Sequence, residues 1–380
     1  MTSAAVEPGP EAWQSRAPAR ATTRHLPSLT SLRWFAASAV FLSHAERLFS
    51  DTSLAPLFAT IAPQGATGVS FFFILSGFVL AWSHRAGDTA RQFYRRRFAR
   101  VVPAYWAMCV VALVVPPLTY NPIESMQDLA TRVLPITLLQ SWVPSAPFYF
   151  GGNSVSWSLS DEVFFYALFP LVIGPLVAMS LRARTALLLG LLAVAMLVPL
   201  VFDNVWVTFV NPVFRLTEFL IGVCLCRLLV AGVRLRVPLT AAVAIATAAY
   251  LIAGLLPERL MLSAATVVPF ALLIFAAAQA DVAGCGARAL HSAVLVRLGQ
   301  WSYSFYLAHA LVVSAFVRAA DGRVDGAAGR LVVMLAAYAA AIAAAYALYA
   351  VVERPFERRI RRRATAVRRA EVAAPATTRG

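Results

Sequence analysis

Residues 67–84 read TGVSFFFILSGFVLAWSH, a stretch in which no Asp, Glu, Lys or Arg occurs. A helix needs about 20 mainly apolar residues to cross the hydrocarbon core of a bilayer. We expect ten such segments, near residues 32–50, 67–84, 101–118, 157–179, 185–202, 212–230, 238–255, 260–280, 299–318 and 331–352. The sequence therefore predicts an all-α polytopic integral membrane protein with about ten transmembrane helices.

The composition excludes an ordinary soluble enzyme. Of 380 residues, 60% are hydrophobic and 13% are charged, whereas soluble domains carry about 25% charged residues. Lysine is absent, so all 33 basic residues are Arg. Nucleic-acid binders carry such residues on exposed faces or in folded motifs, but here the Arg residues lie between long apolar stretches. The expected partner is the lipid bilayer and not a nucleic acid.

The distribution of Arg predicts the orientation. With ten spans and both termini in the cytoplasm, 26 of the 33 Arg residues fall in cytoplasmic segments, as the positive-inside rule requires. The apolar stretch 129–142 is shorter than a span and is bracketed by Pro122, Pro135 and Pro144. Counting it as a span would disturb this Arg pattern, so we interpret it as re-entrant or interfacial. The expected location is the cell membrane, crossed many times.

The chain divides into three parts. Residues 1–30 lack the hydrophobic region of a secretory signal and are predicted to form a disordered cytoplasmic tail. Residues 31–356 form the membrane domain, and residues 357–380 form a basic cytoplasmic tail. Because no His or Cys cluster at zinc spacing accompanies the four cysteines, we expect neither a disulfide nor a metal site.

The first predicted span carries two ionisable side chains, Arg33 and His44. Eleven residues of helix separate them by about three turns and ~16 Å, so they share a face. An Arg near one membrane surface and a neutral His deeper in the bundle suit anion binding at one end and proton transfer at the other. The alternative is an Arg that extends to the membrane surface and a His satisfied in the core.

Arg97 and Arg100 open the third span with i,i+3 spacing, which brings them onto one helix face. Paired guanidinium groups bind phosphates through bidentate hydrogen bonds. The alternative, a charge that only sets membrane topology, suits the neighbouring Arg95 and Arg96 better. The sequence thus indicates an anion site at Arg97 and Arg100.

The fourth span begins WSLSDEVFFY at Trp157 and contains Asp161 and Glu162. A carboxylate near a helix start is favoured by the helix dipole, so a capping role is one interpretation. Glu162 and Tyr166, however, are i,i+4 and continue into the apolar span, which favours a functional role. Two later motifs carry Tyr306 and His309, which suit either core or site, and Glu353, which we interpret as structural.

These motifs, taken in order, resemble the membrane acyltransferase family 3, which includes O-antigen and polysaccharide O-acetylases, nodulation-factor acylases and macrolide acylases. The matching residues are L-T-S-L-R-x10-H from Leu29 to His44, G-V-S-F-F-F-I-L-S-G-F from Gly68 to Phe78 with Ser76, Arg97-x-x-Arg100, Trp157-S-L-S-x-Glu162, S-Y-S-F-Tyr306-L-x-His309 and Glu353-R-Pro355. They extend over nearly the whole ordered chain. Asp161 occupies a position that varies in the family.

The resemblance implies an O-acyltransferase that moves an acyl group, usually acetyl, from acyl-coenzyme A to a hydroxyl, most often on a sugar. It assigns catalytic roles to Arg33, His44 and Glu162 and donor binding to Arg97 and Arg100. Tyr166, Tyr306, His309 and Ser76 are possible further site residues. No permanently bound cofactor is expected. The stretch after residue 357 is too short for the esterase-like domain of some sugar acetylases, which favours a smaller acceptor, such as a glycosylated metabolite.

The residues suggest a mechanism of the same kind. Arg33, Arg97 and Arg100 would hold the phosphates of coenzyme A on the cytoplasmic side. Neutral His44 would accept the proton of the attacking hydroxyl, and Glu162 would orient the resulting imidazolium. The main alternative is a transporter or flippase for a lipid-linked or small amphipathic substrate, which would leave Arg97 and Arg100 unexplained.

Overall fold

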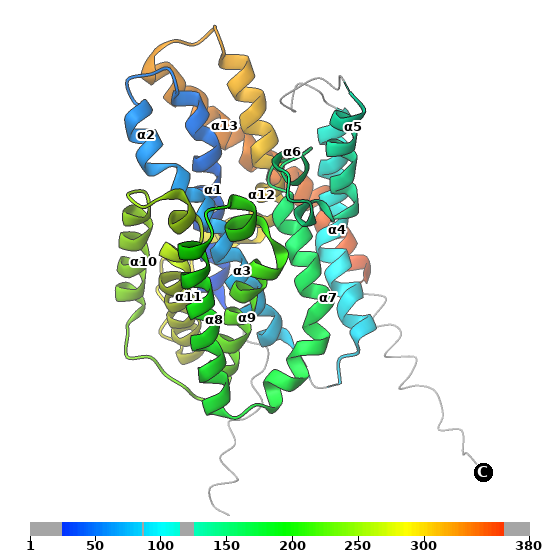
Figure 1. The fold of residues 1–380 in the computed structure, drawn as a ribbon, viewed down its shortest axis with the longest axis vertical. Helices are drawn as coiled ribbons and strands as arrows, with labels where there is room; N and C mark the ends of the chain where they lie inside the picture. Colours follow the sequence, from blue (N-terminus) through cyan, green and yellow to red (C-terminus); the bar gives the residue numbers. More distant parts are fainter. Residues whose placement is uncertain (1–24, 86, 115–124, 361–380) are drawn as a thin grey trace, which may run out of the picture.

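The computed structural model describes residues 25–85, 87–114 and 125–360, and within these ranges the chain forms helices and no strands (Figure 1). Each of the ten expected segments lies largely within a helix. These helices are α1 (Pro27–Ala45), α3 (Gly68–Ser83), α4 (Ala90–Val114), α7 (Trp157–Ala178), α8 (Leu181–Val201), α9 (Pro212–Val230), α10 (Leu239–Ala253), α11 (Ala265–Ala283), α12 (Ala293–Ala320) and α13 (Gly326–Leu348). The all-helical prediction is confirmed for the described residues.

Seven helical runs are long and apolar enough to cross a membrane, and they contain α3, α4, α7, α8, α11, α12 and α13. The other three expected spans differ for physical reasons. Helix α10 has only 15 residues. Helix α9 contains Arg215, Glu218 and Arg227, and α1 contains Arg33 and His44 among several Ser residues. Helix α1, one of these three, carries the first predicted site residues, Arg33 and His44.

The stretch 129–142 forms no continuous helix. Helix α5 (Met126–Val133) passes into a 3-10 turn over Leu134–Thr137, and Leu138 has a positive φ of 60°. A second 3-10 turn (Gln140–Trp142) and the short α6 (Ala146–Tyr149) follow. Because this segment packs above the start of α7, the first turn of α7 is buried inside the bundle (Figure 1).

The molecule has apolar side chains outside and charged ones inside. Leu171 is 69% exposed and Val201 is 75% exposed, whereas the side chains of Arg215 and Asp161 are fully buried. A soluble protein would bury the first pair and expose the second. A hydrocarbon surrounding reverses this preference, because apolar side chains face lipid and ionisable ones face the bundle interior.

Two glycines bring α3 and α9 into direct backbone contact at the centre of the bundle. A Cβ atom on Gly77 would overlap the carbonyl of Phe219, and one on Gly222 would overlap the carbonyl of Ile74. Small residues at such a crossing allow the close approach by which membrane helices pack. This crossing holds α9, which carries Arg215, against α3.

Helix α1 begins earlier than expected, at Pro27, inside the segment 1–30 that we predicted to be a disordered tail. Proline suits the first turn of a helix. The carboxylate of Asp281, at the end of α11, accepts hydrogen bonds from the backbone N–H and the hydroxyl of Ser28, at 2.9 and 2.6 Å. This tertiary cap explains the earlier start. At the other end the last helix continues to Ile360, and the rest of both predicted tails lies outside the described residues.

Candidate active site

Arg100, on α4, is held by two carboxylates from the end of the last helical run. Its Nη1 lies 2.6 Å from Oε1 of Glu353 and 2.9 Å from Oε1 of Glu357. Glu353 is 1% exposed, and its second oxygen accepts a hydrogen bond of 2.7 Å from Ser304. A guanidinium that is already neutralised by two acids has little capacity left for a phosphate. Glu353, interpreted as structural from the sequence, here ties the last helix to α4 through Arg100.

Arg33 and Arg97 differ from Arg100, because no described ion pair includes either of them. Their Nε atoms are buried without a hydrogen-bond partner. The charged groups around Arg33 are Arg100, Glu162 and Glu353, so α1 and α4 bring the three Arg side chains into one region. We call Arg33, Arg97 and Arg100, with Glu162 and Glu353, the arginine cluster. Within it, Arg33 and Arg97 are the two guanidinium groups that form no ion pair among the described residues.

Glu162 belongs to this cluster. Its carboxylate lies beside Tyr166, one turn further along α7, and beside Ser76 of α3, and the positive charges around it are Arg33 and Arg97. The hydroxyls of Ser76 and Tyr166 are 3.5 Å apart. Two further predicted site residues, Ser76 and Tyr166, therefore lie beside the arginine cluster at Glu162. The cluster contains both signs of charge, with the acid placed between α1 and α4.

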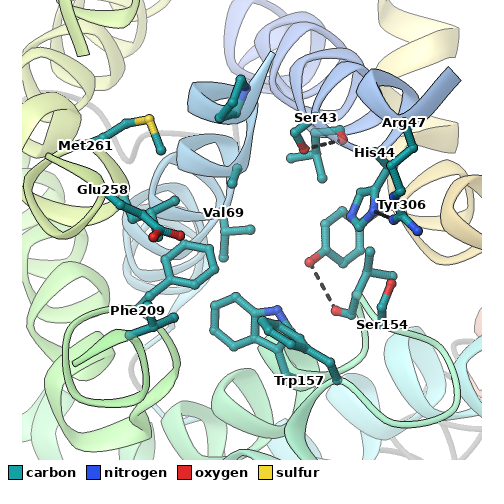
Figure 2. A pocket seen from close by; sticks show the side chains of 17 residues that line it. Ser43, His44, Arg47, Val69, Ser154, Trp157, Phe209, Glu258, Met261 and Tyr306 are labelled. Atoms are coloured by element: carbon teal, nitrogen blue, oxygen red, sulfur yellow. Dashed lines mark hydrogen bonds between the residues drawn. The ribbon is translucent and has the colours of Figure 1, made fainter. Parts of the chain in front are cut away.

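His44 lies elsewhere, in a cavity of about 490 Å³ near the C-terminal end of α1. Figure 2 shows His44, Arg47 and Tyr306 on one side of this cavity and Glu258, Met261 and Phe209 on the other. Most other lining side chains are apolar or aromatic, namely Val40, Pro63, Ala66, Val69, Phe150, Val155, Trp157, Val205 and Leu262. We call this cavity with His44 and His309 the histidine pocket.

His309 and Tyr306, one turn apart on α12, support this wall of the pocket. The rings of His44 and His309 meet edge-on with centroids 5.2 Å apart. The Tyr306 hydroxyl lies 2.8 Å from the Ser158 hydroxyl and donates to the Val155 carbonyl at 3.1 Å. These contacts join α1 and α12 to the buried start of α7.

The predicted site residues thus divide into two groups along α1. The first group comprises Arg33, Arg97, Arg100 and Glu162 of the arginine cluster, with Tyr166 and Ser76 beside Glu162. The second comprises His44, Tyr306 and His309 at the histidine pocket. The expectation that Glu162 orients His44 does not match this geometry. The ionisable neighbours of His44 are His309 and Arg47, because Glu162 lies at the level of Arg33 and not at the far end of α1.

Chemically, the arrangement offers anion binding at one end of a helix and an uncharged base in an apolar cavity at the other. Residues 26–350 match the family model described as an acyltransferase domain. The chain belongs to this acyltransferase family. The resemblance inferred from the motifs is confirmed, and the chain is a multi-pass membrane protein of that family.

Relatives within the acyltransferase family match over most of the chain. Acyltransferase MdmB of Streptomyces mycarofaciens is 36% identical, over 93% of this chain and 98% of its own length. Exopolysaccharide production protein ExoZ of Rhizobium meliloti is 31% identical, over 80% of this chain and 93% of its own. O-acetyltransferase OatA of Staphylococcus aureus is 28% identical over 40% of this chain and 25% of its own. No solved structure matches the chain.

Sequence reasoning missed one buried polar group of this family member. Arg215 of α9 is fully buried, lies 2.8 Å from Glu218 and donates to Ser70 at 3.0 Å. Its guanidinium lies 5.3 Å from the ring of Phe209, which lines the histidine pocket. The predicted span 212–230 contains both residues, and an Arg and a Glu at i,i+3 inside an apolar segment already indicate a buried pair.

Proposed function

We propose that this protein is a membrane-embedded O-acyltransferase that moves an acyl group, acetyl being the first candidate, from acyl-coenzyme A to a hydroxyl of a carbohydrate-containing acceptor. The observation that carries the proposal is the placement of Arg33 and His44 at the two ends of one helix face, each within a different polar site. Eleven residues of helix separate them by about 16 Å. A donor bound by its phosphates at one end must therefore extend its thioester arm along α1 to reach the other.

Arg33 and Arg97 are the proposed phosphate ligands. Both lack an ion-pair partner among the described residues, and a guanidinium binds phosphate oxygens in a bidentate manner. Arg100 holds Glu353 and Glu357 and so positions the last helix beside the donor. This differs from the expectation that Arg97 and Arg100 act alike.

His44 is the proposed general base. It lines the cavity in which an acceptor hydroxyl can approach it, and the apolar lining excludes water that would otherwise hydrolyse the thioester. A cavity of about 490 Å³ with aromatic walls suits one or two rings of an amphipathic acceptor. We therefore propose a glycosylated small molecule or the terminal sugar of a glycan as acceptor.

The proposed orientation places ten helices in the cell membrane with both termini in the cytoplasm. In this orientation α4 begins on the cytoplasmic side, where coenzyme A is available, and the positive-inside rule is satisfied. The histidine pocket then lies towards the opposite face of the membrane. Acceptors that reside outside the cytoplasm would enter from that side.

Binding of acetyl-coenzyme A to purified protein, measured by calorimetry, tests the donor site without knowledge of the acceptor. We expect Arg97→Ala to weaken binding about 10- to 100-fold, since a hydrogen bond to a charged group contributes about 1.5–3 kcal/mol. Arg96→Ala is the matched control on the same helix, because Arg96 is paired with Asp88 at the surface. Absence of binding by folded wild-type protein would favour the transporter alternative.

A further inference from the structure

The hydrogen bonds of His44 define which of its ring nitrogens carries the proton. Nη2 of Arg47 lies 3.0 Å from Nδ1 of His44 (Figure 2). A guanidinium donates hydrogen bonds and cannot accept them, so Nδ1 of His44 must be the acceptor. An imidazolium would carry a proton on Nδ1 and could not accept this bond. His44 is therefore neutral in this arrangement, with its proton on Nε2.

His309 is fixed in the opposite tautomer. Its Nδ1 lies 3.2 Å from the carbonyl oxygen of Phe305, and because a carbonyl only accepts, Nδ1 of His309 carries the proton. The Nε2 atom then has a free lone pair. This atom is buried and has no hydrogen-bond partner, and the whole side chain is 0% exposed.

The two imidazoles are adjacent and held in place. Their centroids are 5.2 Å apart with the planes at 66°. His309 stacks on Phe305 at 5.7 Å and packs against Phe41 at 6.4 Å. A nitrogen that carries a proton, on His44, and a buried nitrogen that lacks one, on His309, therefore belong to neighbouring rings.

We propose that His309 is the positioning residue of His44, accepting its Nε2 proton in a hydrogen bond while Nδ1 acts as the base; this inference rests on the proposed function. It assigns to a neutral histidine the role that we had expected of Glu162. The structure leaves this buried lone pair without a partner, which is uncommon in proteins, and the Nε2–H of the adjacent His44 ring is the donor that would satisfy it. The bond strengthens when His44 becomes an imidazolium, because hydrogen bonds to charged donors are stronger.

Arg47 occupies the base nitrogen until the acceptor arrives. Arg47 and His44 line the same cavity, so a hydroxyl that reaches Nδ1 replaces the guanidinium there. The acceptor O–H bond then breaks as its proton moves to Nδ1, and the oxygen bonds to the acyl carbon of the thioester. The carbon–sulfur bond breaks, and the thiolate of the donor takes the proton from Nδ1. His309 accepts a hydrogen bond throughout and gains no proton.

Two substitutions at residue 309 distinguish a role of His309 in accepting a hydrogen bond from His44 from a role in packing alone. Phenylalanine fills the aromatic site between Phe41 and Phe305 but cannot accept a hydrogen bond, whereas glutamine fills it less well but can. We expect His309→Phe to lower the turnover number about a hundred-fold with an unchanged acceptor KM, and His309→Gln to recover at least a tenth of wild-type turnover. Acetyl-coenzyme A and a macrolide glycoside are the probes. The reverse order of the two variants would overturn the proposal.

Nitrogen-15 spectra of histidine-labelled full-length protein in nanodiscs provide a second test that needs no acceptor. The ring signals are assigned by loss in His44→Asn and His309→Gln. We expect a single Nε2–H tautomer for His44 in the wild type and a mixture in Arg47→Met, which lacks the donor. An Nδ1–H tautomer of His44 in the wild type would overturn the inference. Wild-type protein with the expected tautomers but no transfer to the probe would instead count against the proposed function.

Discussion

The arginine cluster and the histidine pocket lie at opposite ends of α1 and contain different kinds of ionisable group. In the cluster, permanent charges of both signs are gathered, and Arg100 is neutralised by Glu353 and Glu357 while Arg33 and Arg97 are not. In the histidine pocket, the imidazole rings of His44 and His309 meet edge-on, and His309 stacks on Phe305. We therefore propose that one end binds an anion and the other moves a proton, and we expect substitutions to impair the two tasks separately.

The largest effect is expected on acyl transfer, from a substitution in the histidine pocket. His44→Ala is expected to lower acyl transfer about 10²- to 10⁴-fold, the contribution of a positioned general base. Binding of acetyl-coenzyme A should remain within about twofold of wild type, because His44 takes no part in the arginine cluster. Parallel turnover and calorimetric measurements check this. Full transfer activity in a folded His44→Ala protein would disprove the base assignment.

A smaller effect, on the stability of the fold, is expected from a substitution of Arg100, the Arg residue of the cluster that is paired with two carboxylates. Arg100→Ala leaves Glu353, which is 1% exposed, without its cation, and such a loss costs about 3 kcal/mol when the remaining charge is buried. We expect a lower thermal midpoint, measured by thermal shift in detergent. Glu353→Gln added to Arg100→Ala removes the uncompensated charge and should restore much of the stability. If Arg100→Ala instead weakened donor binding without loss of stability, Arg100 would be a phosphate ligand.

The smallest effect concerns the lining of the pocket. Phe150 lines the cavity and is 38% exposed, so Phe150→Ala should leave the fold intact. Loss of part of an aromatic contact corresponds to about 1 kcal/mol, or a roughly fivefold increase in the acceptor KM, with the donor affinity unchanged. Phe98→Ala removes a ring that is 49% exposed and lies outside the cavity, and it serves as the control. Equal effects of the two substitutions would show that the cavity is not the acceptor site.

The positions of most helices could be predicted from the sequence, because the length of an apolar segment depends only on neighbouring residues. All ten expected segments lie largely within helices, and the broken stretch 129–142 is interrupted by Pro135, one of the prolines that suggested it. The number of spans and their orientation stay predictions, because α1, α9 and α10 are too polar or too short to be recognised as spans by length and composition alone. The start of α1 was misjudged, since its cap comes from Asp281, 253 residues away from Ser28.

The sequence predicted which residues belong to the candidate site, but it did not predict how they divide between the arginine cluster and the histidine pocket. Helical spacing correctly suggested that Arg97 and Arg100 lie close together, but it could not reveal that Glu353 and Glu357 reach only one of them. The expectation that Glu162 orients His44 rests on the analogy with hydrolase triads, in which a carboxylate supports the histidine. The placement of Glu162 beside Arg33 depends on how deep in the bundle α7 begins, and residues 134–156 determine that depth.

The sequence by itself determined that this protein is helical, apolar outside and equipped with an Arg and a His on one face of α1, because spacing and hydropathy follow from neighbouring residues. The tertiary structure alone decided which charges of the arginine cluster are compensated and that His309 of α12 lies beside His44 of α1. The physical reason is distance along the chain. A charge in a low-dielectric interior is governed by whichever group packs against it, and here those groups come from helices up to about 260 residues away.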